Sequence, residues 1–511
     1  MSTDQRRICV SICERDVSSL ITAIKSSAEI ANFVELRLDC IAENELRSTT
    51  VELRKLPQNS LLSTIITFRP FEQGGLRPLN FDDRRYFWRE YGFQLPANFF
   101  DLEIDLAEEF FENNEQVDWS RVICSVHDFD GGVVDLNNLY DRLARLPAKI
   151  LKIAVTVDDA IDNIEIFNLL DRAKSEGREL IAIGMGSAGV ATRVLGPARG
   201  SFLTYGAQNR LGSTAPAQLT VSELRNEFRI EQISDSTQVL GLIGHPVVHS
   251  LSPQVHNAVF KTLALDAVYL PFEVKDLASF MLRMVKPATR EIDWRMRGLS
   301  VTTPHKREVM AHLDWIDPAA SEIGAVNTIV IDNDELNGYN TDAIGFINPL
   351  KTRLPNLRGA RCAVIGGGGA AHAAIWALLR EGASVSVFVR DVERAKPLTE
   401  GFDVPVGELK DAAFEGCDVV VNATVLGTTG DFERDTPASA QQLRGARLAY
   451  DLVYNPTETR FLSEAEQVGC ETLGGLSMFV AQAAEQFRLW TGREAPTEVM
   501  RIAAMEALTQ Q

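Results

Sequence analysis

The stretch R-C-A-V-I-G-G-G-G-A-A-H-A-A-I-W-A-L-L-R-E-G-A-S-V-S-V-F-V-R-D, residues 361–391, decides the fold of the second half of this chain. A short apolar run enters a glycine cluster, an alanine-rich segment follows, and an alternating β-branched run ends the stretch. Strand, tight turn, helix and strand in this order form the first βαβ unit of a dinucleotide-binding sheet. Its G-x-G-x-x-A pattern predicts a pyrophosphate on the N–H groups of a helix N-terminus. The residues expected to hold it are Gly366, Gly367, Gly368, Gly369 and Ala370.

The composition bounds the class of protein. A length of 511 residues implies more than one domain, and 45% hydrophobic residues is ordinary for globular domains. A net charge of −19 argues against nucleic acid as a partner, so an anionic substrate must meet local arginine and lysine. The seven scattered cysteines predict a reducing compartment and no disulfide framework. No apolar stretch reaches membrane-spanning length and no signal peptide precedes the first strand, so we expect a cytoplasmic protein.

Eight short β-like runs, most of them separated by helix-length amphipathic segments, fill the first half of the chain. They cover residues 7–13, 33–38, 62–68, 98–104, 121–126, 149–155, 179–185 and 201–205. Regular alternation of eight strands with helices predicts a closed parallel (β/α)8 barrel, a TIM barrel. A doubly wound sheet is the alternative.

Polar residues near the ends of these runs are candidates for a site, because this barrel builds active sites at the carboxyl ends of its strands. For most of them a solvated or ion-paired strand end is an equally open reading. Lys152 differs, since it lies inside the apolar run K-I-L-K-I-A-V. A desolvated amine can attack a ketone, and His127 on the preceding run could move protons beside it.

The motifs V-E-L-R-L-D, T-F-R with G-G, S-V-H-D-F, L-K-I-A and T-A-P-x-Q-L follow one another in the first half. In this order they resemble type I 3-dehydroquinate dehydratase over residues 7 to about 225. The resemblance implies a Schiff-base dehydration, with Lys152 forming the imine and His127 as general acid and base. Gln73 stands where the family has glutamate before its Gly-Gly pair, and Ala217 replaces a family glycine. The implied substrate-binding residues are Glu35, Arg37, Arg69, Arg193, Thr214 and Gln218.

The second half begins near residue 239 with G-H-P-V-V-H-S-L-S-P. Its histidines, His245, His249 and the later His256, are interrupted by prolines and have no acidic or cysteine neighbour, so we expect no metal. Ser250 and Ser252 are expected to donate hydroxyls to a small polar substrate, although serine in such a loop can simply form a turn.

Lys306 and Asp342 follow separate predicted strands. They are either surface charges or the proton-transfer pair of a carbonyl–alcohol redox site. The motifs S-L-S-P, S-V-T-T-P-H-K, G-A-V-N-T, N-T-D, V-N-A-T and M-F-V-A-Q-A stand in one order, and residues 238–505 resemble shikimate dehydrogenase. The resemblance implies that Lys306 and Asp342 transfer the proton. Substrate would be held by Ser250, Ser252, Thr302, Asn327, Asp342 and Gln482, with Tyr454 as a further candidate.

The cofactor expected from this resemblance is NADP. Arg390 and Arg394 lie after the second strand of the dinucleotide-binding unit, where cations favour a 2′-phosphate, whereas neighbouring Asp391 favours the NAD ribose. We expect a modest preference for NADP. The V-N-A-T motif adds Asn422 and Thr424 as candidate cofactor contacts, and Ala343 stands where the family's N-T-D motif continues with glycine.

The two halves together resemble bifunctional dehydroquinate dehydratase–shikimate dehydrogenases. The expected fold is a TIM barrel followed by a two-lobed α/β reductase with a Rossmann NADP-binding domain, and each half is expected to fold and act alone. The partners are 3-dehydroquinate, 3-dehydroshikimate and shikimate, with no nucleic acid or membrane. A sensor of pathway intermediates, or a quinate/shikimate dehydrogenase with an inactive barrel, are the alternatives. The predicted divisions are 1–228 (barrel), 229–238 (linker), 239–350 (substrate-binding domain), 351–472 (Rossmann domain) and 473–511 (C-terminal helices returning to the substrate-binding domain).

Overall fold

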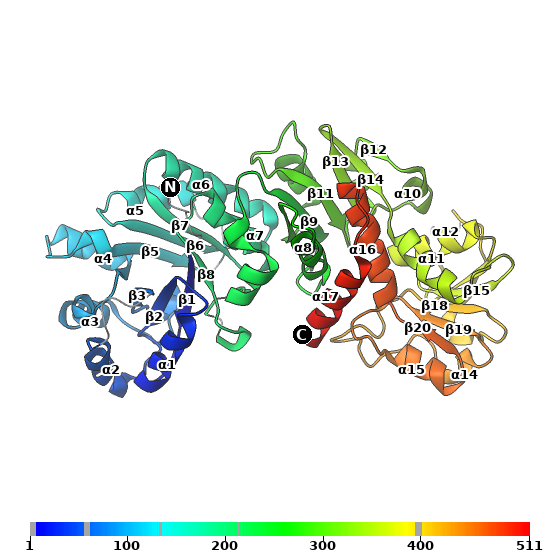
Figure 1. The fold of residues 1–511 in the computed structure, drawn as a ribbon, viewed down its shortest axis with the longest axis horizontal. Coiled ribbons are helices and arrows are strands. Elements are labelled where there is room, and N and C mark those ends of the chain that lie inside the picture. Colours follow the sequence, from blue (N-terminus) through cyan, green and yellow to red (C-terminus); the bar gives the residue numbers. More distant parts are fainter. Residues whose placement is uncertain are drawn as a thin grey trace. The chain divides into compact units, whose positions relative to one another are not determined.

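The computed structural model describes residues 7–55, 62–129, 131, 135–212, 214–215, 217–393 and 401–510. The chain forms two compact units (Figure 1). The first comprises Met1–Val239, Pro246–Val248 and Asp266–Arg295, and the second comprises Leu240–His245, His249–Leu265 and Met296–Gln511.

Eight parallel strands form the barrel, in the spatial order β7-β6-β5-β4-β3-β2-β1-β8. A parallel bridge between Leu180 of β7 and Ser201, shortly before β8, brings the two ends of the sheet together. The barrel prediction is therefore confirmed over the doubly wound alternative, and every strand overlaps a predicted run. The strands are β1 (Ile8–Ile12), β2 (Phe33–Arg37), β3 (Ser63–Thr67), β4 (Phe99–Glu103), β5 (Val122–Asp128), β6 (Ile150–Thr156), β7 (Glu179–Met185) and β8 (Thr204–Gly206).

Amphipathic helices cover the barrel, and polar residues at their N-termini start them. Asp16, Asn80 and Asp135 each precede a helix and accept a backbone N–H group of its first turn. The helices are α1 (Val17–Ser27), α2 (Leu46–Leu53), α3 (Phe81–Glu90), α4 (Ile104–Glu112), α5 (Leu136–Ala144), α6 (Asn163–Ser175) and α7 (Val190–Leu195).

Apolar side chains fill the barrel at the amino ends of its strands. Because successive side chains of a strand point to opposite faces, the interior is filled in layers. The lowest part of the interior is packed by Cys9, Phe33, Ile65, Ile123, Ile150 and Ile181. Polar side chains replace them nearer the carboxyl ends, which is where the barrel can hold a ligand.

The prediction of a chain without disulfides is wrong for one pair. Cys13, directly after β1, is bonded to Cys40, shortly after β2. Since β1 and β2 are parallel neighbours, their carboxyl ends lie side by side and bring together residues 27 apart in sequence. The other five cysteines are free and scattered, as predicted.

Residues 229–238, predicted as a polar linker, contain two side chains that pack into the first unit. Ile230 and Ile233 are buried, and the next strand starts at Gln238. These two apolar side chains anchor the segment, and its other residues are polar.

A segment from the second half of the sequence, residues 266–295, completes the first unit. The Asp159 carboxylate accepts the backbone N–H groups of Lys275 (2.7 Å) and Asp276 (3.0 Å). The buried Trp294 ring packs edge-on against Phe167, with the ring centroids 4.9 Å apart. Polar and apolar contacts thus both tie this segment to the barrel.

A mixed six-stranded sheet, in the order β10-β9-β11-β13-β14-β12, follows the barrel in the sequence. Its strands are β9 (Gln238–Gly244), β10 (Ala267–Glu273), β11 (Met296–Val301), β12 (Trp315–Ile316), β13 (Thr328–Asp332) and β14 (Glu335–Tyr339). The accompanying helices are α8 (Ser252–Thr262), α9 (Leu277–Phe280), α10 (Pro318–Ile323) and α11 (Asp342–Arg353).

The stretch at residues 361–391 forms β15 (Arg361–Ile365), α12 (Gly369–Arg380) and β16 (Ser384–Val389), as predicted. The sheet is parallel in the order β17-β16-β15-β18-β19-β20, which is the 3-2-1-4-5-6 order of a Rossmann fold. The remaining elements are β17 (Val406–Glu408), β18 (Val419–Asn422), α14 (Ala440–Leu443), β19 (Leu448–Asp451), α15 (Arg460–Gln467) and β20 (Glu471–Leu473).

Two helices, α16 (Leu476–Thr491) and α17 (Thr497–Gln510), end the described chain. Trp490 on α16 donates its indole N–H to the carbonyl of Ile329 on β13 (2.9 Å). Gln486 donates to Thr328 Oγ1 (3.1 Å). Helix α16 therefore packs back on the mixed sheet. No helix among the described residues is both long and apolar enough to cross a membrane.

Candidate active sites

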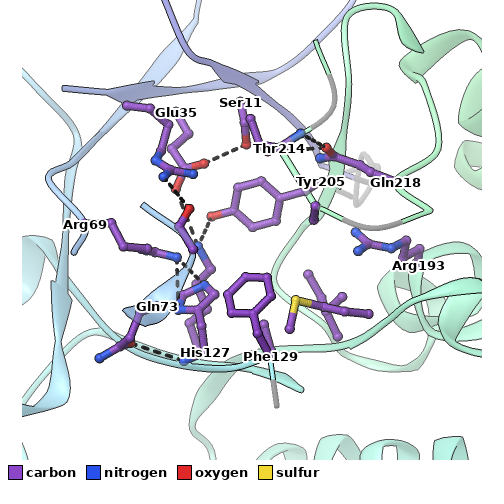
Figure 2. Close-up of a pocket in the computed structure, with 17 residues that line it drawn as sticks. Ser11, Glu35, Arg69, Gln73, His127, Phe129, Arg193, Tyr205, Thr214 and Gln218 are labelled. Carbon is purple, nitrogen blue, oxygen red and sulfur yellow. Dashed lines mark hydrogen bonds and ion pairs between the residues drawn. The ribbon is translucent and has the colours of Figure 1, made fainter. Parts of the chain in front are cut away.

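A polar pocket lies at the carboxyl ends of the barrel strands (Figure 2). It contains about 450 Å³ of empty space, part of which is open to solvent. The barrel residues predicted from the sequence all line this one pocket: Glu35, Arg37, Arg69, His127, Lys152, Arg193, Thr214 and Gln218.

One interior layer of the barrel is polar. Its four buried side chains come from the even-numbered strands: Glu35 from β2, Asp101 from β4, Lys152 from β6 and Tyr205 from β8. Alternate strands supply one layer in a closed barrel of this kind. Lys152 Nζ lies 2.8 Å from Asp101 Oδ2, 3.0 Å from Tyr205 Oη and 3.5 Å from Glu35 Oε1. The amine is thereby fixed at the base of the pocket by oxygens.

His127, at the end of β5, lies against Arg69. Arg69 Nη1 donates to the imidazole and is 2.9 Å from Nδ1. The residue is half-buried, and desolvation of its ring lowers the pKa of His127 well below the ordinary value. The charges of Arg69 and Lys152 lower it further. A neutral imidazole, able to accept a proton, is therefore the resting form.

Two positions where this sequence departs from the family pattern have structural consequences. Gln73 Oε1 accepts the backbone N–H of His127 (3.3 Å), so Gln73 holds the main chain at this residue while Arg69 contacts its ring. Ala217 adopts a positive φ of 50°, a left-handed conformation that costs a residue with a Cβ roughly 1–2 kcal/mol. Next to it, Gln218 accepts the N–H of Thr214 (2.9 Å), which places both side chains on one turn.

Arg37 is held by the buried carboxylate of Asp39, through Nε–Oδ1 (2.9 Å) and Nη2–Oδ2 (2.7 Å) hydrogen bonds. Arg37 also donates to the carbonyl of Gly74 (2.9 Å). Asp39 accepts the backbone N–H groups of Arg69 (3.4 Å) and Leu76 (3.2 Å) as well. One carboxylate, adjacent to the Cys13–Cys40 disulfide in the chain, thus organises the end of β2 and the loop after β3.

Arg193, on α7, lies across the pocket from Arg69 and Glu35 in Figure 2. It is 2% exposed, and its Nε has no hydrogen-bond partner among the described residues. Burial lowers the pKa of Arg193 to about 10, with no neighbouring carboxylate to oppose it. A buried cation with no anion beside it is suited to bind an anionic group of a ligand.

Sequence reasoning missed three polar groups of this site: Asp101, Tyr205 and Ser11. Ser11 Oγ donates to Glu35 Oε2 (2.6 Å), and the other two contact Lys152 directly. Each lies in a short strand with its side chain toward the barrel interior. The signal available in the sequence was the alternation of side chains along each strand, which places these three residues on the same interior face as Lys152.

The predicted reductase pair lies together in the second unit. Lys306 Nζ is 2.6 Å from Asp342 Oδ2. Asn327 donates through Nδ2 to the other oxygen of Asp342 (2.8 Å) and to Thr341 Oγ1 (3.0 Å). Three connections of the sheet therefore meet here: the turn after β11, the start of β13 and the N-terminus of α11.

Of the other predicted substrate contacts, one reaches this network and the rest have contacts of their own. Gln482 on α16 reaches Thr341, whose Oγ1 lies 3.5 Å from Gln482 Oε1. Thr302 follows directly after β11. Ser250 Oγ donates to Ser252 Oγ (3.2 Å) at the start of α8. Tyr454 stacks on Phe479, with the ring centroids 4.7 Å apart, and desolvation raises the pKa of its hydroxyl.

The glycine cluster has the space that a dinucleotide needs. Gly366 has a φ of 122°, and a methyl group there would lie 2.8 Å from the Ala423 carbonyl oxygen, so only glycine fits. A methyl group at Gly368 would meet no atom within 4 Å, which shows open space over the helix N-terminus. At Gly369 it would lie 3.5 Å from Cδ of Lys306, so the loop borders the reductase pair. These residues fit a pyrophosphate-bearing cofactor.

Two of the other candidate cofactor residues shape the adjoining turn. Asn422 is fully buried; its Nδ2 donates to Asp451 Oδ1 (2.9 Å), and its Oδ1 accepts the N–H of Thr424 (3.0 Å). The nitrogen and the oxygen of the Asn422 amide therefore both hold the loop that faces Gly366. Arg390 is exposed directly after β16, and Arg394 lies outside the described residues. No group of three histidine, cysteine or acidic residues suited to a metal ion occurs in the part of the chain that the structure describes.

The folds and sites define an enzyme of two parts, a TIM-barrel lyase joined to a dinucleotide-dependent oxidoreductase. Residues 8–235 match the type I 3-dehydroquinase family. Residues 242–329 match the shikimate dehydrogenase substrate binding domain, and residues 475–505 match the shikimate 5′-dehydrogenase C-terminal domain.

Relatives of known function cover both parts. A bifunctional 3-dehydroquinate dehydratase/shikimate dehydrogenase, chloroplastic, from Arabidopsis thaliana is 33% identical over 96% of this chain and 83% of its own length. A shikimate dehydrogenase (NADP(+)) from Moorella thermoacetica is 42% identical over 54% of this chain and 96% of its own. A crystal structure of shikimate dehydrogenase in complex with NADP+ matches with a TM-score of 0.50 and 36% identity, over 54% of this chain and 96% of that one.

The chain belongs to the family of bifunctional 3-dehydroquinate dehydratase/shikimate dehydrogenases. Its activities are the dehydration of 3-dehydroquinate and the NADP-dependent interconversion of 3-dehydroshikimate and shikimate, in the shikimate pathway. This confirms the predicted function and cofactor over the sensor and the inactive barrel.

Proposed function

We propose that the barrel acts through an imine on Lys152, with His127 as general acid and base. The amine attacks the substrate ketone, whose oxygen leaves as water, and the iminium carbon then withdraws electrons from the adjacent C–H bond. His127 takes that proton and delivers it to the departing hydroxyl, which leaves as a second water. Hydrolysis of the imine consumes one water and restores Lys152. One molecule of water is lost overall.

The observation that carries this proposal is the environment of Lys152. Its amine is buried in the polar layer, at the base of a pocket that also contains a neutral imidazole and the unpaired Arg193 cation. The substrate carboxylate pairs with Arg193, and its hydroxyls meet Glu35, Arg37, Arg69, Thr214 and Gln218.

Borohydride added during turnover of 3-dehydroquinate tests the imine. Peptide mass spectrometry should find a reduced adduct on Lys152, and Lys152→Ala should lose dehydration while retaining shikimate oxidation. Lys149→Ala is the matched control, because Lys149 lies on the same run but is half exposed and pairs with Glu179. An adduct on another lysine, or dehydration by Lys152→Ala, would refute the mechanism.

In the reductase we propose that Lys306 and Asp342 transfer the proton to or from the substrate oxygen. Bound NADPH supplies the hydride. Asp342 orients the ammonium of Lys306, and Asn327 holds the other oxygen of the carboxylate, so a proton can move without rearrangement of the site. The substrate lies against Ser250, Ser252, Thr302, Tyr454 and Gln482.

We propose that the enzyme prefers NADP to NAD, and that Arg390 contributes by attracting the 2′-phosphate. Arg390→Ala should lower the ratio of kcat/KM with NADP to that with NAD several-fold. Arg380→Ala is the control, since Arg380 ends α12 and pairs with Glu322. A wild-type ratio that favours NAD would overturn the assignment.

We also propose the cytoplasm as the site of action, and the predicted division of the chain at residues 229–238, near 350 and near 472. Support comes from the sequence patterns given above. Cell fractionation tests the cytoplasmic location. Limited proteolysis with mass spectrometry tests the division of the chain. Cleavage inside the barrel before cleavage at these three boundaries would argue against it.

A further inference from the structure

The barrel buries a carboxylate that touches Lys152 but does not line the pocket. Asp101, on β4, is fully buried. Its Oδ1 accepts from Ser125 Oγ (2.5 Å) and lies 2.8 Å from Arg69 Nη2, so β5 and the segment after β3 both fix the group. Its Oδ2 faces Lys152 Nζ at 2.8 Å. No substrate atom needs to reach Asp101, yet it contacts the atom at which the reaction takes place.

Imine formation leaves a positive charge at this atom. An ammonium, R–NH3+, and a ketone give an iminium, R–NH+=C, and one water, because two of the three nitrogen protons leave with the ketone oxygen. The charge stays at +1 while the N–H donors fall from three to one. The iminium must remain protonated, since a neutral imine withdraws electrons poorly. The remaining N–H therefore needs one strong acceptor in the barrel wall.

The distances from Lys152 Nζ to the two nearby carboxylates show which of them can accept that N–H. Glu35 Oε1 is 3.5 Å from Lys152 Nζ, and Glu35 already accepts hydroxyl hydrogen bonds from Ser11 (2.6 Å) and Thr67 (2.9 Å). Asp101 Oδ2 is closer, and Lys152 is its hydrogen-bond donor. Burial alone would raise the pKa of Asp101, but Arg69 and Lys152 together lower it far below its ordinary range, so the group stays ionised.

We propose that Asp101 is a further catalytic residue of the dehydratase, the counter-ion that keeps the imine nitrogen of Lys152 protonated. This inference rests on the imine proposed above. It assigns Asp101 to the chemical step and not to substrate binding. Its loss should therefore act on kcat, because the charge that it balances exists only after the substrate is bound.

The test compares Asp101→Asn with Glu103→Gln. Both carboxylates are buried on β4 and lie near Arg69, but only Asp101 touches Lys152. We expect Asp101→Asn to lower kcat for dehydration by about 10²-fold, with KM changed less than about threefold. Glu103→Gln should stay within about threefold of wild type, because burial raises the pKa of Glu103 to about 7 and half of it is already neutral near that pH.

A pH profile separates the counter-ion from a structural role. Without the carboxylate, protonation of the imine depends on solution pH, so the deficit of Asp101→Asn should shrink as pH falls from about 8 to about 6. Reductive trapping with cyanoborohydride, which prefers the protonated imine, should recover in parallel. The groups around Asp101 that titrate or carry charge are Arg69, Lys152, His127, Glu35 and Glu103. They are common to both proteins, so the ratio of their rates isolates Asp101.

The outcomes are distinct. An Asp101→Asn kcat within about threefold of wild type, an equal loss in Glu103→Gln, or a loss only in KM would each overturn the proposal. If the wild type itself gives no trapped adduct, the imine fails and the counter-ion with it. If Asp101→Asn does not fold, judged by thermal unfolding, Ser125→Ala decides. It removes one hydrogen bond to Asp101 and should lower kcat about three- to tenfold at unchanged KM.

Discussion

Arg193→Met should stabilise the free enzyme and strongly lower its dehydratase activity. Arg193 is buried without an anion, and its pKa is lowered to about 10. Because one pKa unit corresponds to about 1.4 kcal/mol, holding this cation costs the folded barrel about 3 kcal/mol. The cost applies fully below the folded-state pKa, so it is constant across the neutral range. Methionine fills a similar volume without the charge and removes most of that cost.

Substrate binding should change in the opposite direction. A guanidinium–carboxylate pair contributes about 1.5–3 kcal/mol per hydrogen bond, so its loss should lower kcat/KM for 3-dehydroquinate by about 10²-fold or more. The melting temperature of the barrel should rise by about 2–4 °C for each kcal/mol gained. A substrate-like carboxylic acid should stabilise the wild type but not the variant.

Steady-state kinetics and thermal unfolding on the same preparations test both effects. Shikimate oxidation should be unchanged, which controls for the rest of the chain. The reasoning would be refuted by a variant that melts lower than wild type while its KM for 3-dehydroquinate stays the same.

Three further results are expected. An imidazole accepts a proton only in its neutral form, and the pKa of His127 lies well below its ordinary value. Dehydratase kcat should therefore stay constant from about pH 8 to about pH 6, and a loss of activity centred near pH 6.5 would contradict this. Removing the Cys13–Cys40 bond with paired serines should lower the unfolding free energy by about 3.5 kcal/mol, because the bond closes a loop between residues 27 apart in sequence; unchanged urea unfolding would argue against this. Lys306→Ala and Asp342→Ala should each lower kcat for shikimate oxidation strongly, and the double variant little further, whereas additive losses would mean independent roles.

The sequence predicts what is encoded within single segments. The βαβ unit around residues 361–391 is recognisable because strand, glycine turn and helix are adjacent. Lys152 stands out because it interrupts an apolar strand, and its motif neighbours lie within a few residues. The eight strands follow from their regular spacing and needed no long-range information.

Contacts that depend on barrel closure could not be predicted in the same way. Asp101 and Lys152 are 51 residues apart, and only the alternate-strand layer brings them together. Cys13 and Cys40 meet because β1 and β2 end in register, a relation that cysteine counting does not contain. Barrel closure likewise brings Gln73 to the backbone N–H of His127 and Arg69 to its ring, although both are more than 50 residues away in the sequence.

The Asp159 and Trp294 contacts have a consequence for separating the two activities. The first compact unit takes residues 266–295 from a part of the chain that follows the start of the mixed sheet. A barrel fragment that stops before residue 266 would uncover the Phe167 ring and leave the Asp159 carboxylate without two N–H donors. The complementary fragment would carry Trp294 into solvent. Splitting the gene at the boundary of the sequence motifs would therefore expose apolar surface on both products. This argues against the expectation that each half folds and acts alone, and we expect both pieces to stay in solution only when they are co-expressed.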